Sequence, residues 1–244
     1  MNANDLFKLP RLYVDQPLAQ DQALALPDSQ AHYLGTVLRR TAGDRVRLFN
    51  GRDGEFLAVL EMPSRKNIVA KPVQLLKPQP TAKTQTHLLF APLKKDALDF
   101  LIEKAVELGA THLHPVLTQN TEVRRLNEER VRQQIIESAE QTERMDIPQL
   151  AAPTELITLL ESWNTEIKIH AGVERDKSID SLPHKYSDNA AFLIGPEGGF
   201  TAQEKSALAS RDFVVPVTLG DTILRAETAA LFCLSARRLT DQIS

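Results

Sequence analysis

Two glycine-rich segments near the carboxyl terminus have residue types and a spacing that suit a ligand-binding pocket. They are Ile194-Gly195-Pro196-Glu197-Gly198-Gly199-Phe200 and Leu219-Gly220-Asp221-Thr222-Ile223-Leu224. Each follows a short apolar run of the kind that forms a strand buried in a parallel sheet. Ligands bind outside the carboxyl ends of such strands, so two loops of this kind predict a pocket. The alternative interpretation is that the glycines only tighten two turns.

The two segments lack the usual nucleotide-binding motifs, so they leave the class of ligand open. Neither segment reads G-x-G-x-x-G, the dinucleotide fingerprint, and neither reads G-x-x-x-x-G-K-[ST], the P-loop. Dinucleotide and P-loop interpretations therefore lack their fingerprints in these segments.

Two charged residues follow the second segment and are the candidates for chemistry. Arg225 comes directly after the apolar Ile223-Leu224 pair, at the expected mouth of the pocket. A guanidinium there can bind a phosphate or support a developing negative charge, and the alternative is an ordinary surface arginine. Glu227 lies near the expected start of a helix, where a carboxylate is stabilised by the helix dipole. Capping and proton acceptance therefore compete as roles for Glu227.

Strands and helices alternate in the part of the chain that must position these residues. Apolar runs predict strands at 88–91, 112–117, 166–171, 190–194 and 214–219, and one-face apolar spacing predicts helices over 96–108 and from about 225 to 239. A further helix is expected from near Asn127. Thr201 and Glu204 stand at capping-box spacing, which predicts another helix start. This alternation predicts an α/β domain over residues 79–244.

The first part of the chain has a different pattern. Residues 45–49 alternate in polarity, the turn 50–54 follows, and residues 55–61 suit a hairpin partner. Residues 28–39 are expected to form an isolated helix. Prolines and threonines between 72 and 84 interrupt the pattern and mark a domain boundary. The sequence therefore predicts a small β-barrel domain over residues 1–78.

Composition excludes several classes of protein. The chain has 244 residues, is 42% hydrophobic, and contains no run of about eighteen apolar residues. Residues 1–10 lack the apolar stretch of a signal peptide. The single cysteine, Cys233, excludes an internal disulfide and is expected to be an inert core residue. We therefore expect a soluble, cytoplasmic protein.

No metal site is expected from the histidines. His112 and His114 stand two residues apart, on one face of an expected strand, without a third ligand at suitable spacing. His170 falls near the end of another expected strand, where it could line the pocket.

The charge distribution gives only modest support for nucleic-acid binding. The net charge is −3, which argues against it, although residues 1–80 hold 11 Lys+Arg against 8 Asp+Glu. Candidate phosphate contacts in this region are Arg39, Arg40, Arg45, Arg47, Arg65 and Lys66. Solvated surface charge is the competing explanation for each of them.

The two glycine-rich segments, in this order and at this separation, resemble the cofactor loops of the SPOUT methyltransferases. The resemblance is specifically to the RsmE family, which methylates N3 of a uridine in 16S ribosomal RNA. It covers nearly the whole chain. Further matching residues are Arg11-Leu12-Tyr13, His32, Val37-Leu38-Arg39, Gly43-Asp44, Phe49-Asn50-Gly51, residues 101–109, Pro115, Glu140-Gln141, Arg144 and Pro148.

This resemblance implies a fold, a cofactor and a substrate. The expected fold is a SPOUT-type α/β domain with a C-terminal trefoil knot, preceded by a PUA-like β-barrel that binds RNA. The cofactor would be S-adenosylmethionine. The partner would be 16S ribosomal RNA or the small ribosomal subunit, and the protein would be a homodimer.

The resemblance also assigns site residues. The implied catalytic residues are Arg225 and Glu227. The implied cofactor-binding residues are Ile194, Gly195, Pro196, Gly198, Gly199, Leu219, Gly220, Ile223, Leu224 and Ala229. The implied RNA-binding residues are Arg11, Arg39, Arg40, Arg45, Arg47 and Arg144.

The sequence departs from the family pattern at two places, and two rival functions stand beside the methyltransferase. Where the family usually has a Ser-Glu-Arg-like stretch, this chain has Thr118-Gln119-Asn120-Thr121, and Asn50 stands where aspartate is common. One rival is an RNA-binding or ribosome-assembly protein of the same fold without catalysis. Another is a metabolic enzyme that binds ATP or NAD. Binding of S-adenosylmethionine would distinguish the methyltransferase from both.

Overall fold

The chain forms two compact units in the computed structural model, which describes residues 3–64, 67–81, 84–173 and 180–243. The first unit comprises Met1–Thr81 together with Ala139–Ile147. The second comprises Ala82–Ser138 and Pro148–Ser244. A short segment from the middle of the sequence therefore belongs to the N-terminal unit.

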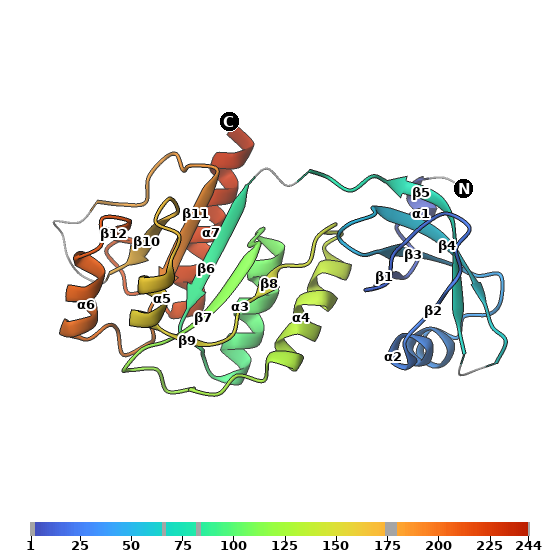
Figure 1. Cartoon of the computed structure of the whole chain (residues 1–244), viewed down its shortest axis with the longest axis horizontal. Helices are drawn as coiled ribbons and strands as arrows, with labels where there is room; N and C mark the ends of the chain where they lie inside the picture. Colours follow the sequence, from blue (N-terminus) through green and yellow to red (C-terminus); the bar gives the residue numbers. More distant parts are fainter. Residues whose placement is uncertain (1–2, 65–66, 82–83, 174–179, 244) are drawn as a thin grey trace. The chain divides into compact units, whose positions relative to one another are not determined.

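The first unit is built on a five-stranded sheet with the order β1-β3-β4-β5-β2 (Figure 1). Its strands are β1 (Arg11–Tyr13), β2 (Leu24–Ala25), β3 (Arg45–Phe49), β4 (Glu55–Glu61) and β5 (Val69–Lys77). β1 runs parallel to β3, and the other pairs are antiparallel. The sequence predicted a barrel, but the outer strands β1 and β2 do not pair with each other within the described residues.

The predicted hairpin of the first unit is confirmed. β3 and β4 pair antiparallel, and the turn between them is held by the Asn50 side chain, whose Oδ1 accepts hydrogen bonds from the backbone N–H groups of Arg52 and Asp53. Gly51 and Gly54 adopt φ values of 76° and 99°, which favour glycine. Asn50 thus stabilises the turn by the local side-chain bonding typical of this residue.

The helix expected over residues 28–39 is shorter and irregular. A short α1 (Ala3–Leu6) precedes it, α2 spans Asp28–His32, and a π-helical turn, η1 (Tyr33–Val37), follows. The chain then leaves the helix with Arg39 at φ 52°, a left-handed conformation. The apolar core of this unit lies between the helical segment and the sheet, and it includes Leu34 and Leu48.

The second unit contains a parallel sheet with the order β12-β10-β11-β6-β7-β8. Its strands are β6 (Gln85–Phe90), β7 (His112–Leu117), β8 (Gln149–Leu150), β9 (Thr154–Glu155), β10 (Lys168–Gly172), β11 (Asn189–Ile194) and β12 (Val214–Val217). All of their pairings are parallel, and β9 pairs with β7 beside the main path. The predicted α/β class is confirmed.

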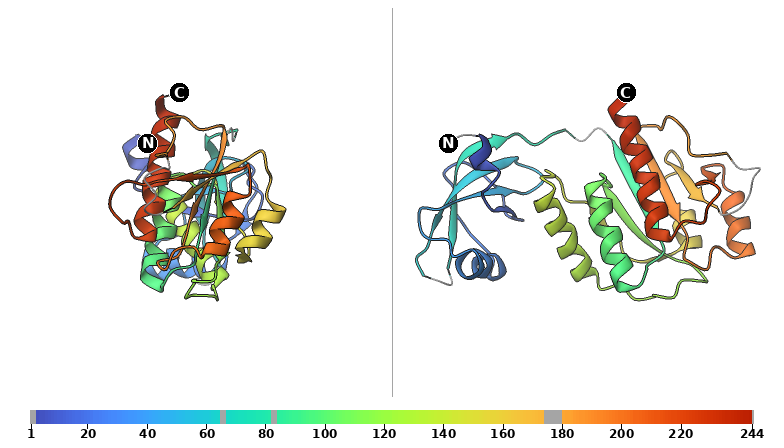
Figure 2. Two further views of the ribbon diagram at one scale, coloured as in Figure 1. Left: turned by 90° about the vertical axis from the view of Figure 1, so that its left-hand side faces the viewer. Right: turned by 180° about the vertical axis from the view of Figure 1, so that it is seen from behind.

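Helices cover both faces of this sheet (Figure 2). They are α3 (Lys95–Glu107), α4 (Glu128–Gln141), α5 (Leu156–Ser162), α6 (Ala202–Ala209) and α7 (Ala226–Ile243). α3 and α7 pack against each other on one face, whereas α5 and α6 pack together on the other. Alternate strand residues supply the two cores, because successive side chains of a strand point to opposite faces.

The two glycine-rich loops follow β11 and β12, which are not neighbours in the sheet. β10 lies between β11 and β12 and pairs with both. The chain passes from β6 outward to β8 and then fills the other side of β6 with β11, β10 and β12. Parallel strands that follow one another in the sequence are joined by long crossover connections. Strands that are consecutive in the sequence therefore need not be adjacent in the sheet.

Among the described residues, no helix is long and apolar enough to cross a membrane.

Candidate functional site

A cavity of about 1110 Å³ lies at the carboxyl ends of β12, β10 and β11. Its walls come from the loops after these three strands and from the start of α7. The lining residues are Gly172, Val173, Ile194, Gly195, Pro196, Glu197, Gly199, Phe200, Thr218, Leu219, Gly220, Asp221, Thr222, Ile223, Leu224, Arg225, Ala226 and Ala229. This is the edge at which open parallel sheets bind their ligands.

The loop after β11 is closely packed. A Cβ built on Gly195 would lie 2.9 Å from two atoms of the Phe200 ring, so no larger residue fits there without a shift. Gly199 has φ 66°, a conformation that favours glycine. The helix α6 then starts with the predicted capping box, in which Thr201 and Glu204 satisfy each other's backbone N–H groups.

The loop after β12 presents backbone groups to the cavity. Gly220 has φ 113°, and its N–H donates to the Thr218 hydroxyl at 3.4 Å. In the described part of the chain, no protein group hydrogen-bonds to the backbone of residues 221–224. Polar backbone groups that line a cavity without protein partners are available to a ligand. The apolar side chains of Ile223 and Leu224 stand beside them.

Residues 118–121, where this chain departs from the family pattern, form hydrogen bonds to the loop after β11 and to the start of α6. The Asn120 side-chain amide donates to the carbonyl oxygens of Gly198 at 3.1 Å and Gly199 at 3.0 Å. The backbone N–H of Gln119 donates to the Glu204 carboxylate at 2.9 Å. The departure therefore leaves a well-bonded connection between the loop after β7 and the cofactor-loop candidate.

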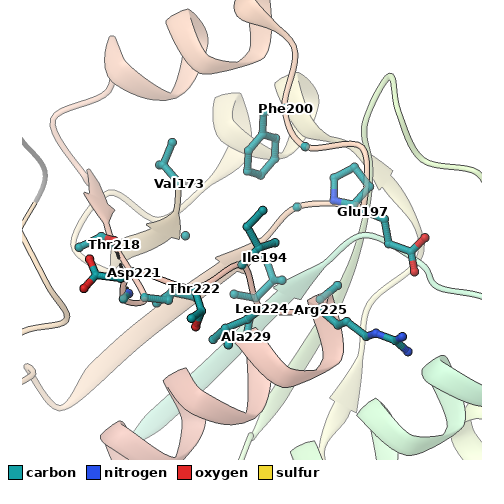
Figure 3. A pocket seen from close by; sticks show the side chains of 18 residues that line it. Val173, Ile194, Glu197, Phe200, Thr218, Asp221, Thr222, Leu224, Arg225 and Ala229 are labelled. Atoms are coloured by element: carbon teal, nitrogen blue, oxygen red, sulfur yellow. Dashed lines mark hydrogen bonds between the residues drawn. The ribbon is translucent and has the colours of Figure 1, made fainter. Parts of the chain in front are cut away.

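Most of the residues assigned from the sequence come together in this cavity. Every implied cofactor-binding residue lines it except Gly198, which lies in the same loop. Figure 3 shows Thr218 and Asp221 at one end of the cavity, and Glu197 and Arg225 at the other. The ends thus carry polar and charged groups, and the middle carries Ile194 and Leu224.

Arg225 and Glu227 are placed differently. Arg225 lines the cavity and is exposed. Glu227 does not line it, and its Oε2 is buried with no hydrogen-bond partner in the described structure. A buried carboxylate oxygen without a donor is unusual in a folded protein and is a candidate proton acceptor.

Sequence reasoning missed one wall of the cavity. Gly172 and Val173, at the end of β10, line it between the two glycine-rich loops. The strand had been expected, and a glycine directly after it was the available signal. His170, by contrast, lies within β10 and packs against Tyr186 and Phe192, so it does not reach the cavity.

Two of the arginines assigned to RNA binding are buried instead. Arg11 and Arg47 are 6% and 4% exposed, and both guanidinium groups contact the fully buried carboxylate of Glu55, at 3.1 and 3.2 Å. Arg11 also donates to the carbonyl oxygens of Ala139 and Arg144. Both side chains are engaged with protein acceptors, which differs from the sequence prediction of phosphate contacts.

The remaining arginines assigned to RNA binding are more accessible. Arg39 and Arg45 are exposed, and Arg40 is half-buried. Arg39 and Arg40 follow the π-helical turn that carries the exposed side chains of Tyr33 and Val37. Arg144 is half-buried and forms an ion pair with Asp146.

A cluster of three histidines lies on β6 and β7, outside the cavity. His87 Nδ1 lies 3.0 Å from His114 Nε2, and the His87 ring stacks on His112 at 4.2 Å. Burial, together with the neighbouring imidazoles, lowers the pKa of His87 to about 3 and that of His114 to about 4. Among the described residues, no group of three or more potential ligands has the geometry of a metal site.

Comparisons with known proteins define the class. The family described as RNA methyltransferase domain matches residues 80–238, and the RNA methyltransferase PUA domain matches residues 26–73. The protein is therefore an RNA methyltransferase with a PUA-like first unit.

Individual relatives narrow the assignment. Ribosomal RNA small subunit methyltransferase E of Rickettsia conorii is 35% identical over 237 residues, which cover 95% of this chain and 96% of that protein. The enzyme of that name from Neisseria gonorrhoeae, solved with S-adenosyl methionine, superposes with a TM-score of 0.83 at 27% identity over 95% of this chain and 97% of that one. A methyltransferase from Legionella pneumophila, solved with SAM, superposes with a TM-score of 0.85 at 26% identity. The match covers 95% of this chain and 98% of that one. The chain belongs to the ribosomal RNA small subunit methyltransferase E family.

Proposed function

We propose that this protein transfers a methyl group from S-adenosylmethionine to N3 of a uridine in 16S ribosomal RNA. The observation that carries the proposal is the cavity at the carboxyl ends of β12, β10 and β11, built from the two loops that the sequence assigned to the cofactor. Membership of the family, and the SAM-bound relatives of similar fold, support the same cofactor and substrate.

The residues of the cavity suit this cofactor. Backbone groups of residues 221–224 have no protein partner among the residues that the structure describes, and they can bind the edge of an adenine, while Ile223 and Leu224 supply apolar contact. The carboxylate of Asp221 is exposed at one end, where it can accept hydrogen bonds from hydroxyl groups. S-adenosylmethionine supplies the methyl group when bound.

The charged residues at the cavity have roles in orientation and proton handling. Arg225 can bind an RNA phosphate or stabilise negative charge that develops on a uracil carbonyl oxygen. Removal of the N3 proton needs an acceptor, and the buried Oε2 of Glu227 is one candidate. Capping of α7, which begins at Ala226, is the competing role for Glu227.

The proposed division of labour follows the predicted domains. Residues 1–78 would bind RNA through Arg39, Arg40 and Arg45, and residues 79–244 would carry out methyl transfer. Removal of Arg39 and Arg45 by substitution with Gln should weaken RNA binding and flatten its salt dependence by about one unit of slope for each lost phosphate contact. An unchanged slope in filter-binding measurements would show that neither arginine contacts phosphate.

Three further features belong to the proposal. The chain of the second unit would thread its C-terminal segment into a trefoil knot, as in other SPOUT proteins. The protein would act as a homodimer, which equilibrium sedimentation can test, and the half-exposed Phe232 and the exposed Leu239 of α7 are available for such an interface. Its place of action would be the cytoplasm, where ribosomal subunits are assembled.

The decisive experiment is mass mapping of small-subunit RNA incubated with the protein and S-adenosylmethionine. One added methyl group on a uridine is expected, and an unmodified RNA would overturn the proposal. Calorimetry with S-adenosylhomocysteine tests the cofactor site separately, since an assembly protein without catalysis need not bind it. In the same assay, wild-type turnover of both Arg225→Lys and Glu227→Gln would remove these residues from the chemistry.

A further inference from the structure

A second, smaller cavity adjoins the first. It has a volume of about 300 Å³ and lies between the loops after β6, β7 and β11. Pro196 and Glu197 line both cavities. A group bound in the second cavity is therefore next to a ligand bound in the first, at the end where Figure 3 shows Glu197 and Arg225.

The walls of the second cavity combine flat apolar surface with a few polar groups. Leu93, Val123 and Pro196 provide the apolar part, whereas Lys94 and Glu122 carry charge. The volume is at the lower end of the range for small-molecule sites, which suits one nucleoside. Enzymes that modify a base hold it, turned out of its stack, between apolar side chains and recognise it through hydrogen bonds at its edge.

Lys94 is the cation of this cavity. Its Nζ lies 2.9 Å from Glu122 Oε2, and the two side chains are 72% and 65% exposed. The hydrogen bond and charge of Glu122, with the charge of Glu197, raise the pKa of Lys94, so the ammonium group stays protonated. An exposed ion pair of this kind adds little to stability, so Lys94 can turn to a ligand at small cost.

We propose that the second cavity receives the acceptor base and that Lys94 donates a hydrogen bond to its C4 carbonyl oxygen. This inference rests on the proposed function, because it requires a base beside the methyl donor. Uracil offers a carbonyl oxygen at C4, whereas cytosine offers an amino group that an ammonium cannot bind. Lys94 therefore selects uracil over cytosine, and its charge stabilises the oxygen when N3 loses its proton. Glu122 is the positioning residue that holds Lys94 at the cavity.

The test compares two RNA fragments. Both contain the nucleotide located by mass mapping, and the second carries cytidine there in place of uridine. Their affinities are measured by fluorescence anisotropy in the presence of S-adenosylhomocysteine, so no turnover is involved. The wild type should prefer the uridine fragment by about tenfold, as expected for one lost charged hydrogen bond. Lys94→Met keeps an unbranched side chain only one atom shorter but removes the charge, and it should bring the ratio of the two affinities close to one.

A matched control is available on α3, the helix that begins directly after Lys94. Lys104, near the end of α3, also pairs with carboxylates at the surface, those of Glu103 and Glu107. Lys104→Met should keep the wild-type preference. A full preference in Lys94→Met would overturn the assignment. So would a salt slope lowered by about one in Lys94→Met, because that result identifies a phosphate contact.

Failure of this inference can be told from failure of the proposed function. A wild-type protein that methylates no small-subunit RNA contradicts the function itself. A protein that methylates uridine and keeps its base preference without Lys94 contradicts only the assignment of the second cavity.

Discussion

Asn120 holds Gly198 across two loops that are far apart in the sequence. The Asn120 amide nitrogen lies 3.1 Å from the Gly198 carbonyl oxygen, and a Cβ built on Gly198 would lie 3.2 Å from Asn120 Cβ. The loop after β7 and the loop after β11 are thus bonded and closely packed at the same point. We therefore expect this contact to help fix the shape of the cofactor-loop candidate.

Substitution of Asn120 by Ala should therefore weaken cofactor binding. The variant loses both hydrogen bonds to the glycine carbonyls, and the loop has to be ordered when the ligand binds. The affinity for S-adenosylhomocysteine, measured by calorimetry, should fall by about tenfold. Asn164→Ala is the matched control, because it removes an exposed asparagine of the same unit whose Oδ1 accepts from the Glu166 N–H at a turn. Equal affinities for the two variants would show that the contact does not shape the site.

Substitution of Gly195 by Ala should displace the same loop by a different route. The added Cβ would stand 2.9 Å from two atoms of the Phe200 ring, so the ring or the backbone must move. We expect S-adenosylhomocysteine to bind at least about tenfold more weakly, as for overpacking in other tightly packed sites. Gly195→Ala combined with Phe200→Leu should recover part of the affinity, because the smaller side chain makes room. A double variant no better than Gly195→Ala would locate the defect elsewhere.

Substitution of Glu55 by Gln should destabilise the first unit. The change leaves the buried guanidinium groups of Arg11 and Arg47 beside a neutral amide. Breaking a buried charge pair in this way costs about 3 kcal/mol of unfolding free energy, which urea denaturation can measure. Asp21→Asn makes the same chemical change in the exposed pair with Lys71, and it should cost no more than about 0.5 kcal/mol. Similar losses in the two variants would contradict the assigned role of Glu55.

The histidine cluster should make the second unit less stable in acid. Burial lowers the pKa of His87 to about 3 and of His114 to about 4, so the folded state binds fewer protons than the unfolded state below pH 6.5. The free energy of unfolding should therefore keep its full value above pH 6.5 and fall as the pH drops toward 4. The slope is at most about 1.4 kcal/mol per pH unit for each histidine. His87→Asn should flatten the profile measured by denaturation, and an unchanged profile would contradict the argument.

The sequence predicted much of the site because its signals are local. Glycines at strand ends, a capping box at Thr201 and Glu204, and apolar spacing in the helices each depend on a few consecutive residues. The structure confirms the capping box and the α/β alternation. The loops assigned to the cofactor line one cavity. Local patterns could indicate that these loops bind a ligand, but they could not show where the cavity lies.

What the sequence by itself determined is the set of elements and the loops with ligand-binding character. The tertiary structure alone decided that β10 lies between β11 and β12, that Arg11 and Arg47 are buried on Glu55, and that Lys94 reaches a cavity beside the candidate cofactor site. The physical reason is the range of the interactions. Backbone propensity and capping act over a few residues, whereas strand order, burial of charge and the meeting of loops depend on packing between residues far apart in the chain.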